Sequence, residues 1–157
     1  MSREATRRLW ILIASIVVAD QLTKHWALNR LSGDRTIDLV GSLRFNLAFN
    51  RGMAFSQATG AGPVIGALGF VIVIVIVLWL RRSATGVAAV AAGMIVGGAI
   101  GNLIDRLFRG EAWLRGAVVD FIDLQWFPIF NIADSAISVG AVLMILASFR
   151  KPAVPES

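Results

Sequence analysis

The sequence predicts an all-α membrane protein with four transmembrane helices and a small extracytoplasmic β-sheet that forms a cradle, in one domain over residues 1–157. Hydrophobic residues make up 57% of the chain and charged residues only 16%, whereas a soluble domain carries about 25% charged residues. Uncharged stretches recur that are long enough to cross a bilayer. Between two of them, apolar and polar residues alternate, which is typical of a half-exposed β-strand.

The first predicted span covers residues 9–28, which are apolar through Ala19 and then include Asp20 and Lys24. The four-residue separation of Asp20 and Lys24 fits an ion pair on one helix face, or a lysine that extends outward to water. Three arginines precede the span, as in a secretory signal peptide. Because cleavage would leave an odd number of spans, and no clear small-x-small site follows, we expect the segment to remain as a helix.

The first outer loop, residues 29–59, contains the alternating segment. Apolar residues take every second position in much of 36–40 and again in 43–50, on either side of Gly41 and Ser42. A period of two with a turn between predicts a β-hairpin that has one apolar and one polar face. Such a hairpin suits the outer surface of the membrane.

Two further spans follow from uncharged runs, the later of which is extended back over IFNIAD and so includes Asp134. Residues 60–80 contain FVIVIVIVLWL and form the second predicted span, and residues 129–149 form the fourth. β-Branched runs also occur in buried strands, but an uncharged stretch of this length favours a spanning helix. The second outer loop, 107–128, includes AVVDFIDLQWF, which could add a strand to the sheet. In the tail, 150–157, the segment PAVPES is predicted to be disordered.

The third predicted span, residues 85–106, is rich in alanine and glycine. Gly93, Gly97 and Gly101 recur every four positions. Small residues at this spacing let a neighbouring helix approach closely in a membrane. This glycine face is therefore a predicted packing surface of the bundle.

The charged residues separate between the two sides of the membrane. The chain has 15 basic and 10 acidic residues, a net charge of +5. Seven basic and two acidic residues lie near the termini and between the second and third spans, whereas eight of each lie on the other side. Excess basic residues in short loops mark the cytoplasmic side. We therefore predict a multi-pass protein of the cytoplasmic (inner) membrane with both termini in the cytoplasm, and we attribute the basic residues to orientation and membrane lipids, without a nucleic-acid partner.

The acidic residues of the spans cluster near the opposite side. Measured from the nearest cytoplasmic arginine at 1.5 Å per residue, Asp20 lies roughly 18 Å, Asp105 roughly 34 Å and Asp134 roughly 24 Å along its helix. In a hydrocarbon core about 30 Å thick, all three fall in the outer half or at the outer boundary. Asp120 belongs to the second outer loop. Ionisable groups at such depths are candidates for function.

Spacing within the helices brings further polar groups to the same region. Asn102, Asp105 and Arg106 share one helix face, as do Asn131 and Asp134. An ion pair within or between helices is an alternative explanation for Asp105 and Arg106. Asp134 is harder to explain in this way, because no basic residue lies within four positions of it.

The residue inventory limits the chemistry to carboxylates. The chain has no cysteine, which excludes a thiol nucleophile, disulfides and cysteine metal sites, and its one histidine makes a Ser-His-Asp triad improbable. Two carboxyl groups in hydrogen-bond range share one proton, so that one can activate water while the other donates to a carbonyl oxygen. The same acids could bind a metal, but no histidine-containing ligand motif supports this. Any two of five acids could pair on this reasoning: Asp20, Asp105, Asp120, Asp123 and Asp134.

Five motifs around these residues resemble those of the bacterial lipoprotein signal peptidases (signal peptidase II). They occur in the family's order over nearly the whole chain and touch three predicted spans and both outer loops. Each motif alone is a weak signal, and the ordered set is a strong one. The motifs are ADQLTK (19–24), NRGMAF (50–55), GGAIGNLIDR (97–106), VVDF (118–121) and FNIADSAI (130–137).

This resemblance implies four transmembrane helices, a small outer sheet that cradles the substrate, and cleavage of prolipoprotein signal peptides just before the diacylglyceryl-modified cysteine. It implies Asp120 and Asp134 as the catalytic pair near the extracytoplasmic face. No metal or cofactor is expected, the partners are lipid-modified prolipoproteins and membrane lipids, and we expect a monomer. The residues implied to order the catalytic pair and its surroundings are Asn102, Asp105, Arg106 and Asn131, and those implied to shape the substrate site are Asp20, Lys24, Asn50 and Gly52.

Three features in and near the motifs concern a loop, a competing acid and candidate lipid contacts. The stretch IDLQWFPI between the two catalytic motifs is short for the family, which leaves the conformation of this loop open. Asp123 is a competing acid close to Asp120, and we interpret it as a surface residue. Met53 and Phe55 are candidates for contact with lipid chains or for ordinary interface anchors.

Two other classes of function compete with a peptidase. A small proton-coupled transporter or channel would also use intramembrane carboxylates, but such proteins tend to place them near the midplane and often have repeated halves. We see no internal repeat, and the acids lie off-centre. A non-catalytic helical scaffold would tolerate neutralisation of Asp134.

Overall fold

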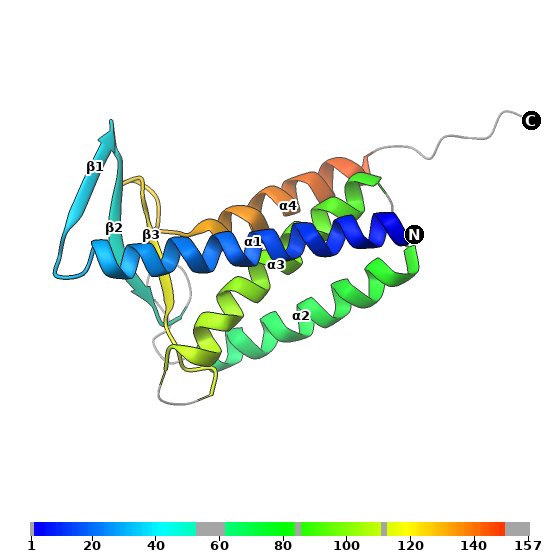
Figure 1. Cartoon of the computed structure of the whole chain (residues 1–157), viewed down its shortest axis with the longest axis horizontal. Helices are drawn as coiled ribbons and strands as arrows, with labels where there is room; N and C mark the ends of the chain where they lie inside the picture. The colour runs from blue at the N-terminus through cyan, green and yellow to red at the C-terminus, as the bar shows by residue number, and fades with distance from the viewer. Residues whose placement is uncertain (1, 53–61, 84–85, 111–112, 150–157) are drawn as a thin grey trace, which may run out of the picture.

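We describe a computed structural model of the chain, which covers residues 2–52, 62–83, 86–110 and 113–149. Four helices run side by side, and a sheet lies across one end of them (Figure 1). The helices are α1 (Arg3–Arg30), α2 (Gly62–Ser83), α3 (Gly86–Phe108) and α4 (Ile132–Ser148). The strands are β1 (Thr36–Val40), β2 (Leu43–Asn50) and β3 (Val118–Asp123).

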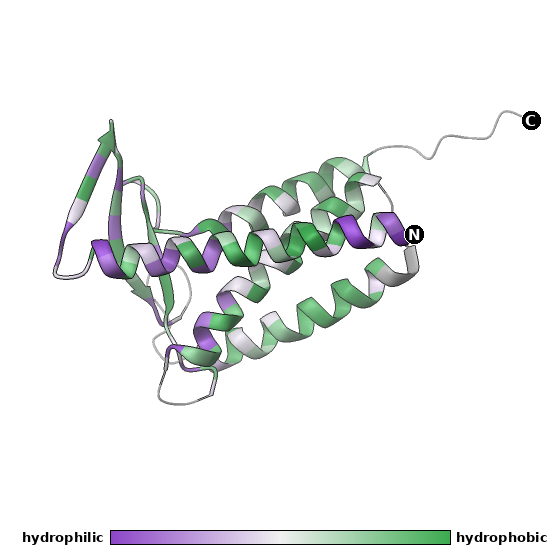
Figure 2. Ribbon diagram, in the orientation of Figure 1, coloured by the Kyte–Doolittle hydropathy of each residue, from purple (hydrophilic) through white to green (hydrophobic). Residues whose placement is uncertain are grey.

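Helix α3 is the centre of the bundle, because it packs against each of the other three helices. The start of α1 and the end of α4 lie at the end of the bundle remote from the sheet (Figure 1). Hydrophobic residues cover most of the helices, and hydrophilic ones gather at the start of α1 and near the sheet (Figure 2). This distribution places the polar residues at the two ends of the bundle.

The outer surface of the helices is apolar, as expected of a protein surrounded by lipid. On α2, Val64 is 62% exposed and Val75 is 58% exposed. An apolar surface of this extent is unusual for a soluble monomer. Helices α1, α2 and α3 are long and apolar enough to cross a membrane, and α4, with 17 residues, is apolar but shorter. The predicted helical membrane fold with a small sheet is confirmed.

Helix α4 begins at Ile132, inside the expected span 129–149, because Asn131 is its N-cap. The Asn131 side chain accepts a hydrogen bond from the backbone N–H of Asp134, and the Asp134 side chain accepts one from the backbone N–H of Asn131. This reciprocal capping satisfies N–H groups that have no partner within the helix. Phe130 instead pairs with Ile122 in an isolated β-bridge.

The predicted hairpin is confirmed, and the second outer loop supplies a third strand. The strand order is β1-β2-β3, and both pairs are antiparallel. Gly41 adopts a φ of 57° in the turn between β1 and β2, a conformation that glycine reaches without strain. Asp120 on β3 pairs with Ala48 on β2, so the sheet places this acid beside the bundle.

Glycines on α3 let its neighbours approach closely. A methyl group at Gly93 would overlap Leu9 of α1, and one at Gly98 would overlap the backbone carbonyl of Ala133 on α4. The predicted packing role of glycine in this span is therefore confirmed, and it extends to Gly98. The close approach of α4 at Ala133 fixes the position of the next residue, Asp134.

Gly98→Ala should lower stability, because the added methyl group meets backbone that can move only if α3 and α4 separate. We expect a loss of about 1–3 kcal/mol, measured as a lower thermal midpoint in detergent. Gly69→Ala on α2 is the matched control, since its methyl group would meet the Leu103 side chain at an ordinary distance of 3.7 Å. Equal midpoints for the two variants would contradict the close-packing argument.

Candidate active site

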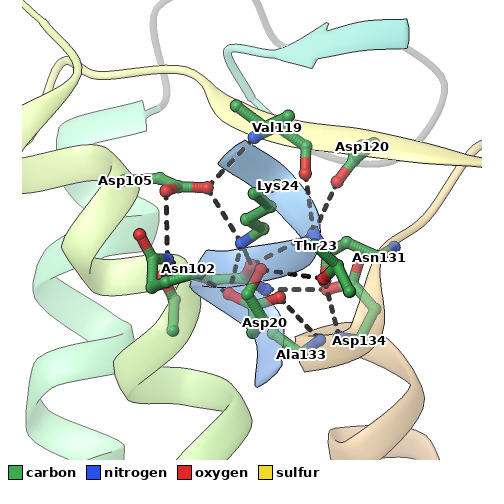
Figure 3. Close-up of polar contacts among 12 residues, drawn as sticks. Asp20, Thr23, Lys24, Asn102, Asp105, Val119, Asp120, Asn131, Ala133 and Asp134 are labelled. Carbon is green, nitrogen blue, oxygen red and sulfur yellow. Dashed lines mark hydrogen bonds and ion pairs between the residues drawn. The ribbon is translucent and has the colours of Figure 1, made fainter. Parts of the chain in front are cut away.

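The predicted site residues gather where the helix bundle meets the sheet. Asp20 and Lys24 come from α1, Asn102 and Asp105 from α3, and Asp120 from β3 (Figure 3). Asn131 and Asp134 complete this group at the start of α4 (Figure 3). Three further predicted residues lie beside the group: Asn50, Gly52 and Arg106.

Asp120 and Asp134 are joined through Asn131. The Nδ2 atom of Asn131 donates to Asp120 Oδ1 at 2.6 Å. The Oδ1 atom of Asn131 accepts from the backbone N–H of Asp134 at 2.9 Å, and the backbone N–H of Asn131 donates to Asp134 Oδ2 at 3.3 Å. The structure therefore brings together the two acids that the motifs implied, from elements that the sequence alone could not place side by side.

Asp120 is held in a state that resists ionisation. It is 2% exposed. Burial and the nearby Asp134 carboxylate raise its pKa from 3.8 to about 7, although hydrogen bonds from Asn131 and Asn50 act in the opposite direction. A carboxyl group with a pKa near neutrality can both hold and release a proton at physiological pH.

Asp134 has a different environment. It is partly exposed and lines a cavity, whereas Asp120 lies farther inside. Its Oδ1 atom accepts from Asn102 Nδ2 at 2.7 Å, and it lies in the first turn of α4, where the helix dipole favours negative charge. Asp134 is thus better placed than Asp120 to carry the negative charge of the pair.

Asp20 and Lys24 lie behind the site, not at the cavity wall. Both are 0% exposed, and Lys24 Nζ lies 2.8 Å from Asp20 Oδ2 and 2.8 Å from Asp105 Oδ2. The ion pair expected from their spacing is therefore present, and the alternative of an outward-reaching lysine is wrong. The other oxygen of Asp20 accepts from the backbone N–H of Ala133 at 2.9 Å, which fixes the first turn of α4 against α1.

Asp105 pairs with cations other than its neighbour Arg106. Its Oδ2 atom contacts Lys24, and its Oδ1 atom lies 2.6 Å from Arg109 Nε. Its Oδ2 atom also accepts from the backbone N–H of Val119 at 3.1 Å, next to Asp120 on β3. The alternative of an ion pair within or between helices is thus confirmed for Asp105, whereas Arg106 forms no ion pair within the described residues.

A cavity of about 290 Å³ opens beside Asp134. Apolar residues of α2, α3 and α4 line most of it, together with the polar residues Asn50, Asn102 and Arg106. Arg106 is 6% exposed, and its Nη2 atom donates to the carbonyl oxygen of Gly52 at 3.3 Å. Within the described parts of the chain, Arg106 Nη1 is a buried donor without a hydrogen-bond partner. This leaves it available to a ligand in the cavity.

The interpretation of Asp123 as a surface residue is wrong. Asp123 is buried, with only 4% of its surface exposed. Its carboxylate accepts from Arg44 Nε at 2.8 Å, from the backbone N–H of Gln125 at 2.7 Å and from Asn46 Nδ2 at 3.2 Å. Burial acts to raise its pKa, but these contacts outweigh burial and lower it. Asp123 therefore joins β2 to β3 and has its own cation.

Sequence reasoning missed two residues of the site. Gln21 Nε2 donates to Asp105 Oδ1 at 3.2 Å, and Arg109 pairs with the same atom. The signal for Arg109 was its position four residues after Asp105, a common spacing for a helical ion pair. Gln21 gave no comparable signal, because its partner lies on another helix.

Two other expectations concern a metal site and the candidate lipid contacts. In the described residues, no group of three or more histidine, cysteine, aspartate or glutamate side chains is arranged to hold a metal ion. Met53 and Phe55, the candidate lipid contacts, lie outside the described residues.

Comparison with known proteins identifies the family. Residues 12–150 match the family model described as signal peptidase (SPase) II. The chain belongs to the signal peptidase II family. The resemblance carried by the five motifs is therefore confirmed, and the protein is a peptidase of a bacterial membrane family.

Named relatives and solved structures agree with this membership. The chain is 41% identical to the lipoprotein signal peptidase of Mycobacterium leprae (strain Br4923), over 90% of this chain and 71% of that protein. It is 39% identical to that of Mycobacterium avium (strain 104), over 90% of this chain and 80% of that protein. A bacterial membrane enzyme solved by the in meso method at 2.3 Å superposes with a TM-score of 0.79 and 27% identity, with 94% of each chain covered.

The contacts of Asp123 predict a pH-dependent contribution to stability. Because its pKa is lowered on folding, Asp123 stabilises the fold above the ordinary carboxyl pKa of 3.8, and this contribution is lost as the pH falls through its lowered value. Asp123→Asn should cost about 1–3 kcal/mol at pH 7 and much less in strong acid. Thermal midpoints of the variant and the wild type at both pH values check this. A deficit that is independent of pH would show that the ion pair is not its source.

Proposed function

We propose that the protein is an aspartic endopeptidase that removes signal peptides from diacylglyceryl-modified prolipoproteins, with Asp120 and Asp134 as its catalytic pair. The observation that carries this proposal is the joining of the two acids through Asn131, at the polar end of a membrane bundle. Membership of the lipoprotein signal peptidase family supports prolipoproteins as substrates and favours a peptidase over a transporter or a scaffold. The scissile bond would be the one just before the lipidated cysteine.

The different environments of the two acids support a division of roles. Asp120 holds the shared proton, because it is the more deeply buried acid and its pKa is about 7. Asp134 is the base, because Asn102 and the N-terminus of α4 stabilise its negative charge. Like-charge repulsion between the pair keeps one proton on it at neutral pH.

In this mechanism Asp134 takes a proton from water, and the resulting hydroxide attacks the carbonyl carbon of the scissile peptide bond. Asp120 gives its proton to the carbonyl oxygen, which produces a neutral tetrahedral intermediate. When the carbon–nitrogen bond breaks, Asp134 gives its proton to the leaving amine. Asp120 recovers a proton from a hydroxyl group of the intermediate as the new carboxyl group forms, so the pair returns to its starting state.

The cavity beside Asp134 is the proposed substrate site. Its apolar walls on α2, α3 and α4 suit the signal peptide helix and acyl chains that enter sideways from lipid. Arg106 Nη1, a buried donor without a partner among the described residues, can bind a carbonyl oxygen of the substrate. Water must also reach the scissile bond, which suits a site at the rim of the bilayer better than one at its midplane.

The orientation in the membrane is part of the proposal. The start of α1 and the end of α4 lie together at the end remote from the sheet (Figure 1), and the basic excess of the sequence belongs to that end. This supports cytoplasmic termini, with the sheet and the catalytic pair near the extracytoplasmic face of the bacterial inner membrane. We propose one domain over residues 1–157 with four spanning helices, which acts as a monomer in contact with membrane lipids.

Asp120→Asn and Asp134→Asn should each lower cleavage at least about a thousandfold, since each removes one partner of the proton transfer. The measurement is the mass loss of a diacylglyceryl prolipoprotein mixed with detergent-purified protein. Asp123→Asn is the matched control and should retain most of the activity, because its carboxylate faces Arg44. Substantial cleavage by either Asp120→Asn or Asp134→Asn would contradict the catalytic assignment.

The stability of Asp120→Asn can be predicted separately from its activity. Because the pKa of Asp120 is raised on folding, its contribution to stability is complete below 3.8 and is lost as the pH rises through about 7. Asp120→Asn should therefore be at least as stable as the wild type at pH 8, so that its inactivity cannot be attributed to unfolding.

The pH dependence of kcat/KM gives a further prediction. Asp120 must be protonated to donate, so activity should fall about tenfold per pH unit above its pKa of about 7. A pH series with the same prolipoprotein substrate checks this. Activity that stays constant to pH 9 would exclude Asp120 as the proton donor.

A further inference from the structure

Lys24 lies at the centre of the polar cluster but reaches neither the cavity nor the exterior. Its side chain is 0% exposed. Its Nζ atom lies 2.8 Å from Asp20 Oδ2, 2.8 Å from Asp105 Oδ2 and 2.9 Å from Asn102 Oδ1. An ammonium group has three donors, and these three acceptors use all of them. Lys24 therefore has no donor left for a substrate.

The contact with Asn102 fixes the orientation of an amide. An asparagine side chain has an acceptor oxygen on one side and a donor NH₂ group on the other. Because the Asn102 oxygen faces Lys24, its Nδ2 atom faces Asp134 and donates to Oδ1 at 2.7 Å (Figure 3). The reversed amide would set NH₂ against an ammonium group and oxygen against a carboxylate. Lys24 thus excludes the reversed orientation.

Asn131 extends this chain of hydrogen bonds from Asn102 to Asp120. Its Nδ2 atom donates to Asn102 Oδ1 at 3.2 Å and to Asp120 Oδ1 at 2.6 Å. Its own oxygen is thereby directed to the backbone N–H of Asp134. Two oriented amides therefore connect one buried cation to both members of the pair.

We propose that Lys24 is a positioning residue of the cleavage reaction: by holding the carbonyl oxygen of Asn102, it turns the amide NH₂ group toward Asp134 and keeps that carboxylate ready to accept a proton from water. The inference rests on the proposed function, because it assumes that Asp134 is the base. It differs from a purely structural role, which would leave the pH profile unchanged, and from direct substrate binding, which would act on KM.

The test must keep the buried charges balanced. Lys24→Met alone would leave the carboxylates of Asp20 and Asp105 without their shared cation, and unpaired buried charges are strongly destabilising. The double variant Asp20→Asn/Lys24→Met removes one charge of each sign and retains an oxygen at position 20 for the N–H of Ala133. Asp20→Asn alone is the matched control, because it keeps Lys24. The charged groups that interact with Asp134 come from three other elements: Asp20 and Lys24 of α1, Arg106 of α3 and Asp120 of β3. The double variant changes only the first two of these.

We expect kcat of Asp20→Asn/Lys24→Met to fall roughly tenfold to a hundredfold relative to Asp20→Asn, which corresponds to the loss of one hydrogen bond to a charged group. KM should stay within about twofold, since the ground-state binding of substrate is not changed. The acid limb of the kcat profile should move to higher pH, because Asp134 loses a donor that favours its charged form. Asp20→Asn alone should not move this limb upward.

Asn102→Ala provides a second variant in which both ion pairs of Lys24 remain. It should move the acid limb in the same direction, and its combination with Asp20→Asn/Lys24→Met should add little, because all these changes interrupt one connection. If the double variant does not fold, this variant still tests the connection between Asn102 and Asp134 through which Lys24 is proposed to act. An acid limb that Asn102→Ala leaves unmoved would overturn the proposal.

Two other results would also overturn it. One is a folded Asp20→Asn/Lys24→Met protein, with a thermal midpoint close to that of Asp20→Asn, that keeps the kcat and acid limb of Asp20→Asn. The other is a raised KM with unchanged kcat, which would assign Lys24 to substrate binding. Failure of the proposed function is distinguishable, because it would appear as cleavage by Asp120→Asn or Asp134→Asn, variants in which Lys24 is intact.

Discussion

The ion pairs of one buried lysine hold the polar end of this bundle together. Lys24 on α1 compensates the carboxylates of Asp20 and Asp105, and each of these binds a backbone N–H of another element. Asp20 accepts from Ala133, the residue before Asp134, and Asp105 accepts from Val119, the residue before Asp120. The two acids of the site are therefore placed by their chain neighbours. If the lysine charge were lost, the carboxylates that anchor α4 and β3 would repel each other inside a medium of low dielectric.

Packing of small residues makes this electrostatic arrangement possible. Asp20 Oδ2 lies so close to α3 that a methyl group at Gly101 would come within 2.6 Å of it. The same face of α3 accepts the first turn of α4, since Gly98 lies against the carbonyl of Ala133. Close approach shortens the distances between charged groups, and shorter distances strengthen the pairing that offsets the desolvation of buried ions. The glycines and the ion pairs thus stabilise one geometry together.

Much of the fold followed from local patterns in the sequence. The alternation over 36–50 predicted β1 and β2, and long, mostly apolar stretches predicted the helices, because both patterns are properties of neighbouring residues. The five motifs brought out the site residues, although spacing alone left five acids as candidates. What could not be predicted were contacts between distant segments. Arg44 and Asp123 lie 79 positions apart, so nothing local showed that Asp123 would be buried.

The distribution of cations among the buried acids explains how one bundle can combine stability with acid–base chemistry. Asp20 and Asp105 share Lys24, and Asp123 has Arg44. In the described parts of the chain, Asp120 and Asp134 form no ion pair, and their hydrogen-bond donors are amide groups. A cation beside either acid would hold it ionised and remove its ability to keep a proton near neutral pH. Amides orient the carboxyl groups without adding a charge, so the pair can share one proton while the surrounding ion pairs keep the helices in place.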